Sequence, residues 1–218
     1  MLKQQIEELK KAVIEQANQV DLMIKLSIEG LLEKDNSKLE RVLEIEELVN
    51  TNEIRIEEEA ITLIALQKPE AKNLRTILMI IKMNNDLERM GDLAENITQS
   101  AEYLIRKPFI KKLINLPAMA EVTMNMVKQS IDSFINEDTK LAEQVCIDDD
   151  IVDDLKEQIY RVLITFMTSD PTTIKRAIHI NKIASNLERI ADLSTNIAED
   201  TIYIAKGTVV KHQADHDS

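Results

Sequence analysis

Cysteine, glycine, proline and aromatic residues are all scarce in this chain of 218 residues. It contains only 3 Gly and 4 Pro, too few for the many tight turns of a β-rich fold. Aromatic residues make up 3% of the chain and Trp is absent, so the core must be built from aliphatic residues and Met, which is typical of packed long helices. The single cysteine, Cys146, excludes an intrachain disulfide and fits a reducing cytosol. These absences predict an all-α, cytoplasmic protein.

Long hydrophobic runs are also missing. The chain starts without the basic and apolar regions of a secretory signal, and its longest apolar runs, such as residues 77–81, fall far short of the roughly 20 residues that span a bilayer. Acidic residues outnumber basic ones 39 to 27, for a formal net charge of −12. Nucleic-acid phosphates and anionic lipids repel such a surface. We therefore expect no direct nucleic-acid binding, and membrane contact only through partners.

Apolar residues recur every three or four positions almost throughout, which is the helical period. The pattern breaks at residues 107–117, which hold two of the four prolines, so we place a domain boundary there. Asp35, Asp138 and Asp170 are expected to cap helices, and Pro69 and Pro171 to lie in first helical turns. The predicted helices are 6–32, 37–66, 69–106, 117–136, 138–168 and 171–205, arranged in domains 1–107 and 117–207 with a flexible tail at 208–218.

The two halves of the chain repeat one another. Residues 86–93 (DLERMGDL) return as residues 186–193 (NLERIADL), and Asn96 returns as Asn196. Upstream, Glu46 returns as Asp149. A unit of three helices can close its own small core. The repeat therefore predicts two tandem three-helix bundles with six long helices.

Acidic and amide side chains form stripes on these helices. If Glu88 is set at 0° on a helical wheel, Asp92 and Asn96 fall at about 40° and 80°, whereas Leu87 and Met90 fall on the opposite, apolar side. The second copy repeats this stripe with Glu188, Asp192 and Asn196. The preceding helix of each half has a stripe of its own. In the first half it consists of Glu46, Asn50, Glu53 and Glu57, and in the second of Asp149 and Asp153, followed by Lys156 and Tyr160. Helices pack about 8–10 Å apart, so stripes on neighbouring helices can face one another.

Carboxylate and amide oxygens are hard ligands, so the stripes predict a surface site for metal ions. The donor type favours Mg, Mn, Ca or Fe over Zn, but does not identify the ion. A solvated acidic face is the alternative for any single pair of acids, and the recurrence of the whole pattern favours the metal site. A di-iron bundle is excluded because no Glu-x-x-His occurs and the acids point away from the core. The candidate metal ligands are Asp149, Asp153, Glu188, Asp192, Asn196, Glu46, Asn50, Glu88, Asp92 and Asn96.

The remaining reactive residues carry no catalytic pattern. No Gly-rich phosphate loop, nucleophile elbow or CxxC occurs, so no enzymatic activity is expected. His179 is expected to be a packing or surface residue, and Cys146 to be inert. His212 and His216 lie in the tail and are not expected to form a site. Arg89 and Arg189 are expected to pair with neighbouring acids or helices rather than to bind an anion.

The chain resembles the PhoU family of phosphate-uptake regulators over nearly its whole length. The resemblance is carried by residues 186–192 with 195–199, by their first copy at 88–92 with 96–97, by residues 56–69, and by 169–171 leading into 176–179. It implies two three-helix bundles whose Glu/Asp-x-x-x-Asp motifs hold surface metal clusters (Fe, Mn, Mg, Zn or Ca) in some members. It also implies a negative regulator that represses the phosphate-starvation response by contacting the ATPase subunit of the phosphate ABC transporter and the sensor histidine kinase, and that forms homodimers.

This sequence departs from the family pattern at several positions. Asn50 stands where the family usually has Asp, Ala191 replaces the usual Gly, and Leu93 and Leu193 replace other residues. Because Asn50 removes a charge from the first site, the second site, with Asp149, Asp153, Glu188 and Asp192, is the stronger candidate for metal. The alternative function is a structural or metal-binding helical dimer that serves another phosphate transporter.

Overall fold

The computed structural model describes residues 2–110 and 115–206. No strand occurs among these residues, so the prediction of an all-α protein with six long helices is confirmed. The helices are α1 (Leu2–Glu33), α2 (Asn36–Gln67), α3 (Ala71–Ile105), α4 (Leu116–Asn136), α5 (Thr139–Ser169) and α6 (Ile174–Lys206), with a 3-10 turn, η2 (Pro171–Thr173), before α6.

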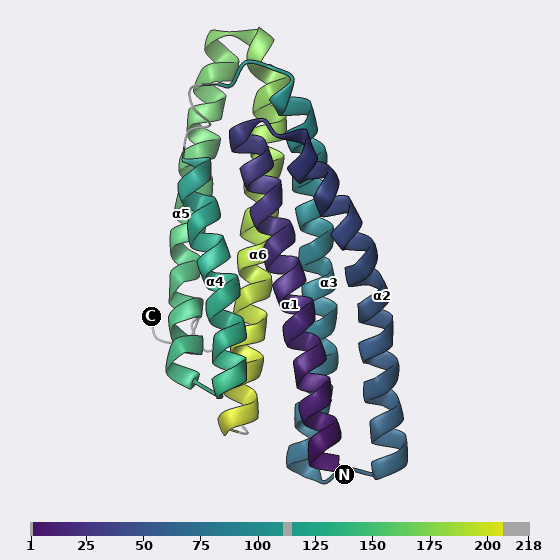
Figure 1. The fold of residues 1–218 in the computed structure, drawn as a ribbon. Coiled ribbons are helices and arrows are strands. Elements are labelled where there is room, and N and C mark those ends of the chain that lie inside the picture. The colour runs from purple at the N-terminus through teal and green to yellow at the C-terminus, as the bar shows by residue number, and fades with distance from the viewer. Residues whose placement is uncertain (1, 111–114, 207–218) are drawn as a thin grey trace, which may run out of the picture.

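The helices form two antiparallel three-helix bundles that lie side by side along one long axis (Figure 1). Helices α1–α3 make the first bundle and α4–α6 the second. The bundles meet chiefly where α3 packs along α6, with a smaller contact between α1 and α4. The division into domains 1–107 and 117–207 stays a prediction, and the predicted tail at 208–218 lies outside the described residues.

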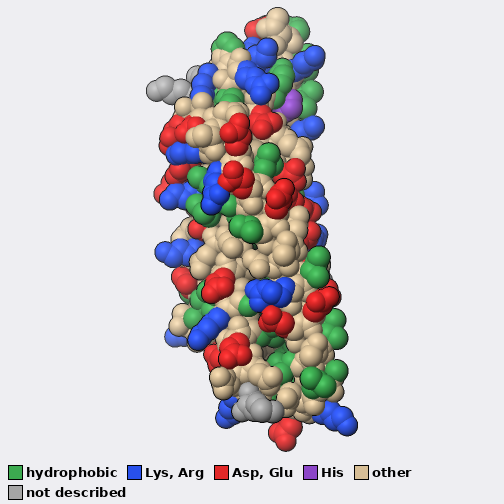
Figure 2. Space-filling view, turned by 45° about the vertical axis from the view of Figure 1, so that its right-hand side comes forward, with side chains coloured by type: hydrophobic (Ala, Val, Ile, Leu, Met, Phe, Trp, Pro, Cys, Tyr) green, Lys and Arg blue, Asp and Glu red, His purple; other side chains and the backbone are tan. Residues whose placement is uncertain are grey.

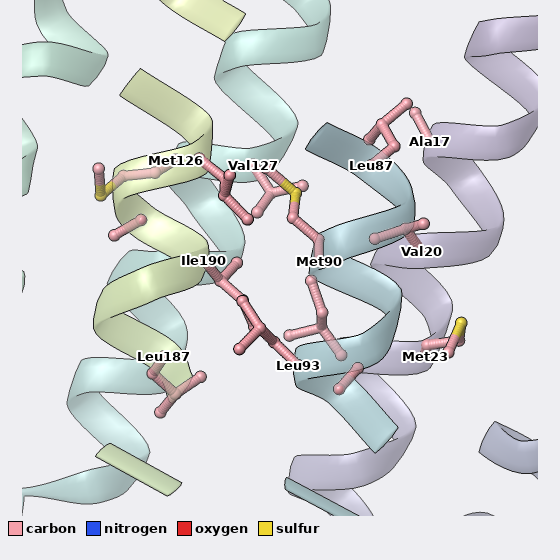
Figure 3. Close-up of a cluster of buried hydrophobic side chains, with 14 of the residues drawn as sticks. Ala17, Val20, Met23, Leu87, Met90, Leu93, Met126, Val127, Leu187 and Ile190 are labelled. Atoms are coloured by element: carbon pink, nitrogen blue, oxygen red, sulfur yellow. The ribbon is translucent and has the colours of Figure 1, made fainter. Parts of the chain in front are cut away.

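The buried side chains form one cluster that runs through both bundles. Figure 3 shows its middle, where Ile190 of α6 and Leu93 of α3 lie between the two helices, with Leu187 of α6 farther to the left and Met23 of α1 to the right. Met90, Ile190 and Leu187 have no exposed surface. The apolar stripes of α3 and α6 therefore serve two purposes, because each fills its own bundle and also joins the two bundles together.

Aspartate side chains start helices in both halves, as predicted. Asp35 accepts from the Ser37 backbone N–H at 2.9 Å, and Asp138 accepts from the backbone N–H groups of Lys140 and Leu141. Asp170 caps η2 rather than α6 itself, by accepting from the Thr172 N–H at 3.0 Å. The placement of Pro69 in the first turn of the third helix is wrong: α3 begins at Ala71, after Glu70 in extended conformation. None of the helices in the described ranges has both the length and the apolar character needed to cross a membrane.

We predict that Gly30→Ala destabilises the first bundle. A Cβ atom at this position would lie 2.6 Å from Cδ2 of the fully buried Leu39 and 3.1 Å from the Asp35 carbonyl oxygen. Overpacking of this kind costs about 1–3 kcal/mol. The free energy of unfolding, measured by urea denaturation, should fall by that amount.

Gly91→Ala is the matched control. A Cβ there would lie 3.4 Å from the nearest atom, Cγ1 of Val49, and the repeat carries Ala191 at the equivalent position. Because Ala is the better helix former, this substitution should be neutral or stabilising by up to about 1 kcal/mol. Equal stability of the two variants would contradict the assigned packing at Gly30.

Candidate functional site

The predicted acidic stripes of the first bundle face one another. We call Glu46, Glu53 and Glu57 of α2 with Glu88 and Asp92 of α3 the first acidic cluster. Burial raises the pKa of Glu88, and the negative charges of Asp92, Glu53 and Glu46 raise it further, although Arg89 opposes them. The pKa of Glu53 is also raised, by burial and by Glu57. Acids on two different helices are therefore close enough to repel one another.

Two buried amides hold α2 in this position. The Gln16 side chain of α1 donates to the Val49 carbonyl at 2.8 Å, and the Asn84 side chain of α3 donates to the Glu53 carbonyl at 2.8 Å. These bonds lie one turn apart on α2, beside the acidic stripe. Sequence reasoning missed both residues, because a lone polar residue in an apolar stripe does not reveal its partner. Asn50 lies outside the bundle, where its amide donates to Glu46 at 2.8 Å.

The second bundle repeats the arrangement with Asp149 and Asp153 of α5 and Glu188 and Asp192 of α6, which we call the second acidic cluster. Burial raises the pKa of Asp149 to about 6, helped by the charges of Asp192, Asp153, Asp150 and Glu188. Burial, Glu188 and Asp153 likewise raise the pKa of Asp192. The four acids that the sequence assigned to the stronger site are therefore neighbours.

One cation lies inside the second acidic cluster. Lys156 Nζ is 2.5 Å from Glu188 Oε1, and both side chains are partly buried. Lys156 also lines a groove of about 480 Å³ between α5 and α6, together with Asp153 and Glu188. This ion pair neutralises one of the four carboxylates. The second cluster consequently has less free negative charge than its sequence suggested.

The two copies of the stripe meet at the contact between α3 and α6. A groove of about 350 Å³ runs along this contact and is lined by the same four residues of each repeat: Arg89, Asp92, Leu93 and Asn96, with Arg189, Asp192, Leu193 and Asn196. Leu93 and Leu193 form its buried floor. Sequence reasoning treated the two copies as separate sites, and the packing of α3 on α6 brings them together.

Every acidic member of these clusters lies outside the hydrophobic core. Asp92, Asp153 and Asp192 are exposed, whereas Glu46, Glu88, Asp149 and Glu188 are partly buried. The predicted outward orientation of Glu188 and Asp192 is therefore confirmed. Figure 2 shows one face of the molecule, with acidic side chains along much of its length and basic ones between them.

The donor atoms of both clusters suit a hard cation, because they are carboxylate and amide oxygens. Their present arrangement is not a finished metal site: within residues 2–110 and 115–206, no three His, Cys, Asp or Glu side chains are grouped so that they could hold one ion. Metal binding would therefore require these side chains to rotate toward one another. The raised pKa values supply a reason, since a cation would relieve the repulsion between the carboxylates.

Two other candidate residues have structural roles. The His179 ring stacks on Tyr103 with ring centroids 4.2 Å apart, which confirms it as a packing residue. Burial raises the pKa of the Cys146 thiol to about 11, so the thiol is protonated near neutral pH and is a poor nucleophile. His212 and His216 lie outside the described residues.

The fold and these clusters define the class: an all-α protein of two three-helix repeats with paired acidic stripes on the outside. The PhoU domain family matches residues 13–101 and 116–201, and the chain belongs to this family. The phosphate-specific transport system accessory protein PhoU homolog of Aquifex aeolicus is 42% identical over 209 residues, covering 96% of this chain and 95% of the relative. A homolog of the same description from Thermotoga maritima is 33% identical, covering 97% and 90%.

Solved structures agree with this assignment. The crystal structure of PhoU from Pseudomonas aeruginosa has a TM-score of 0.92 at 30% identity and covers 95% of this chain and all of that one. The phosphate transport system regulatory protein PhoU from Streptococcus pneumoniae has a TM-score of 0.89 at 23% identity, covering 96% and 99%, which shows likeness of fold. The names of the Aquifex aeolicus and Thermotoga maritima relatives describe accessory proteins, and that of the Streptococcus pneumoniae structure describes a regulatory protein.

We predict that Asp149→Asn stabilises the protein near neutral pH. Because the folded-state pKa of about 6 lies above the ordinary value of 3.8, the folded state binds more protons than the unfolded state between these values. Stability is therefore lost as the pH rises through that window, and the loss persists above it. The full shift corresponds to roughly 3 kcal/mol, but solvent screens a partly exposed carboxylate, so the variant should be more stable than the wild type by about 1 kcal/mol at neutral pH and equally stable below pH about 4.

Urea denaturation with EDTA present measures both values without interference from bound metal. Asp154→Asn is the control, because Asp154 is exposed on the same helix. It should leave stability unchanged at both pH values. A stability gain for Asp154→Asn as large as that for Asp149→Asn would show that net charge, rather than the cluster, sets the effect.

Proposed function

We propose that this chain is a regulatory accessory protein of a phosphate-specific transport system. In this role it represses phosphate uptake and the phosphate-starvation response when phosphate is ample. The proposal is supported by the names of the relatives that match 96% and 97% of the chain and by membership of the PhoU family. The protein would work without catalysing a reaction, by binding to other proteins.

The observation that carries the mechanism is the excess of negative charge in the two acidic clusters. Glu188 is paired with Lys156, but the carboxylates of each cluster still raise one another's pKa values, so several negative charges lie close together. A concentrated charge of this kind steers a basic partner to the surface and aligns it there. Because the two clusters are related by the repeat and held on one core, the chain can present similar docking surfaces to two partners.

We propose that these partners are the ATPase subunit of the phosphate ABC transporter and the sensor histidine kinase. The chain would then be an adaptor that acts in the cytoplasm and reaches the membrane only through its partners. Self-association into a homodimer is compatible with this role. The outer faces of α2 and α5 carry exposed aliphatic side chains that a second copy could cover, including Ile54 and Ile61 on α2 and Ile147 on α5.

We further propose that both clusters take up hard metal ions. The second cluster would use Asp149, Asp153, Glu188 and Asp192, and the first would use Glu46, Glu88 and Asp92, with Asn50, Asn96 and Asn196 as amide donors near them. Lys156 competes for Glu188 in the second cluster. The first cluster has more acids, although Asn50 donates to one of them. Bound ions would change the charge that a partner meets.

Deleting the gene should leave phosphate-starvation promoters active in rich phosphate. A promoter reporter in the deletion strain measures this, with the wild-type chain supplied back as the reference. We expect the double variant Asp92→Asn plus Asp192→Asn to fail to restore repression, because both substitutions remove charge from the groove between α3 and α6.

The matched control is Glu15→Gln plus Glu121→Gln, which removes two exposed charges from α1 and α4. It should restore repression fully. Normal repression in the deletion strain would overturn the regulatory role. Full repression by the groove variant would leave regulation in place and overturn only the part assigned to the groove.

Metal binding is tested separately by elemental analysis of the purified protein. The wild type should contain metal, and Glu188→Ala plus Asp192→Ala should lose at least the share held by the second cluster. Glu15→Ala plus Glu121→Ala should keep the wild-type content. Equal metal content in all three proteins would contradict the assigned ligands.

A further inference from the structure

A second recess lies beside the groove between α3 and α6 and differs from it in charge. It measures about 360 Å³, and its charged lining residues are Lys182 and Arg189 of α6. The remaining lining residues are amides and hydroxyls, among them Asn96 and Ser100 of α3, and none is a carboxylate. We call this recess the Lys182 pocket. It is a positively charged cavity in a chain whose net charge is −12.

The internal repeat shows what normally surrounds these two cations. Positions 81–105 and 181–205 align without a gap, so Lys82 corresponds to Lys182 and Arg89 to Arg189. In the first copy both cations have acidic partners. Lys82 Nζ lies 2.6 and 2.7 Å from the two carboxylate oxygens of the buried Asp200, which reaches across from α6. Arg89 lies 3.6 Å from the carboxylate of Asp86.

In the Lys182 pocket the cations remain and the acids are replaced. Ser100 stands at the position equivalent to Asp200, and Asn186 stands at the position equivalent to Asp86. Both residues line the pocket. In the described part of the chain, no carboxylate lies within ion-pair distance of Lys182 or Arg189. Arg89 pairs with an acid, as expected, whereas Arg189 forms no such ion pair with any residue that the structure describes; the alternative, that Arg189 pairs with a neighbouring helix, stays a prediction.

The nearby acids compensate only part of this charge. Arg189 helps to keep Asp192 ionised, so it is influenced by the second acidic cluster without forming a close pair. Gln99, which lines the pocket, donates a hydrogen bond to Glu95 at 2.9 Å. Among the described residues, no carboxylate forms an ion pair with Lys182. Its charge acts instead on the packed His179 ring, whose pKa is lowered by burial and by Lys182.

Lysine and arginine beside several amide and hydroxyl donors make a site for an oxyanion. Arginine presents a planar fork of N–H donors that matches phosphate oxygens, and lysine adds a compact positive charge. The Ser100 side chain, only 4% exposed, lies in the pocket where the first copy has the carboxylate that binds its lysine. A bound oxyanion would neutralise the charge of Lys182 as the Asp200 carboxylate neutralises that of Lys82.

We infer that the Lys182 pocket binds a small tetrahedral oxyanion, with inorganic phosphate as its ligand. This inference goes beyond the adaptor role and does not depend on it, because binding is a property of the purified chain. The pocket differs chemically from the acidic clusters, since its lining contains no carboxylate, although Asn96 lines both this pocket and the groove that holds Asp92 and Asp192.

The test is isothermal titration of the purified full chain with inorganic phosphate, in EDTA so that no metal bridges the anion. The wild type should bind about one phosphate per chain. Ser100→Asp should weaken binding by about tenfold or more, because the new carboxylate would pair with Lys182 as Asp200 pairs with Lys82. The fold already accommodates that arrangement in the first copy, so the variant should remain folded, which circular dichroism checks.

Asn125→Asp is the control, since it adds the same charge at an exposed position on α4. It should bind phosphate as the wild type does, which would show that the loss in Ser100→Asp is local. Absence of saturable binding to the wild type at millimolar phosphate would overturn the inference. So would unchanged affinity in folded Ser100→Asp, or an equal loss in Asn125→Asp. Normal repression in the deletion strain would overturn the proposed regulatory role and would leave this binding result untouched.

Discussion

The packing of α3 against α6 determines where every other feature of this molecule lies. Leu93 of one helix and Leu193 of the other line the two sides of the groove between them, and both side chains belong to a single buried cluster that extends through both bundles. Because equivalent residues of the repeat form both sides of this contact, the polar residues that follow them on each helix also meet. Asp92 and Asp192 therefore line one groove, although they lie 100 positions apart in the chain.

The two repeats share their apolar pattern and the polar residues of the Glu88 and Glu188 stripes, and they differ at other polar positions. Leu87, Met90 and Ile97 match Leu187, Ile190 and Ile197, since a change of volume in a close-packed core is costly. Polar positions on the rim are freer to change. In the second acidic cluster Lys156 forms an ion pair with Glu188. The pocket around Lys182 is lined by Ser100 and Asn186, where the region around Lys82 has Asp200 and Asp86. One scaffold thus holds regions of opposite charge side by side.

Local periodicity explains how much of this could be predicted from the sequence. The helices and the orientation of Glu188 and Asp192 follow from a turn of 100° per residue, so they were predicted correctly. Pro69 was misplaced because α3 begins two residues later, at Ala71, and Glu70 before it makes no side-chain capping bond that the sequence could have revealed. Three features depend on which helices pack together: the groove that joins the two stripes, the hydrogen bonds from Gln16 and Asn84 to α2, and the Lys182 pocket. The spacing of residues within one helix does not specify which helix will be its neighbour.

The difference between the Lys82 and Lys182 regions shows whether folding requires the Lys182 pocket to lack an acid. If the backbone could not accommodate an acid opposite the lysine, folding alone would explain why Ser100 stands there. The first copy shows that it can, because Asp200 sits almost fully buried against Lys82 with both oxygens in contact. A cation left near the surface costs little stability when water can reach it, and Lys182 is exposed. Folding is therefore satisfied by either arrangement. Among the described residues no carboxylate forms an ion pair with Lys182 or Arg189, which leaves room for a counter-charge from outside the chain.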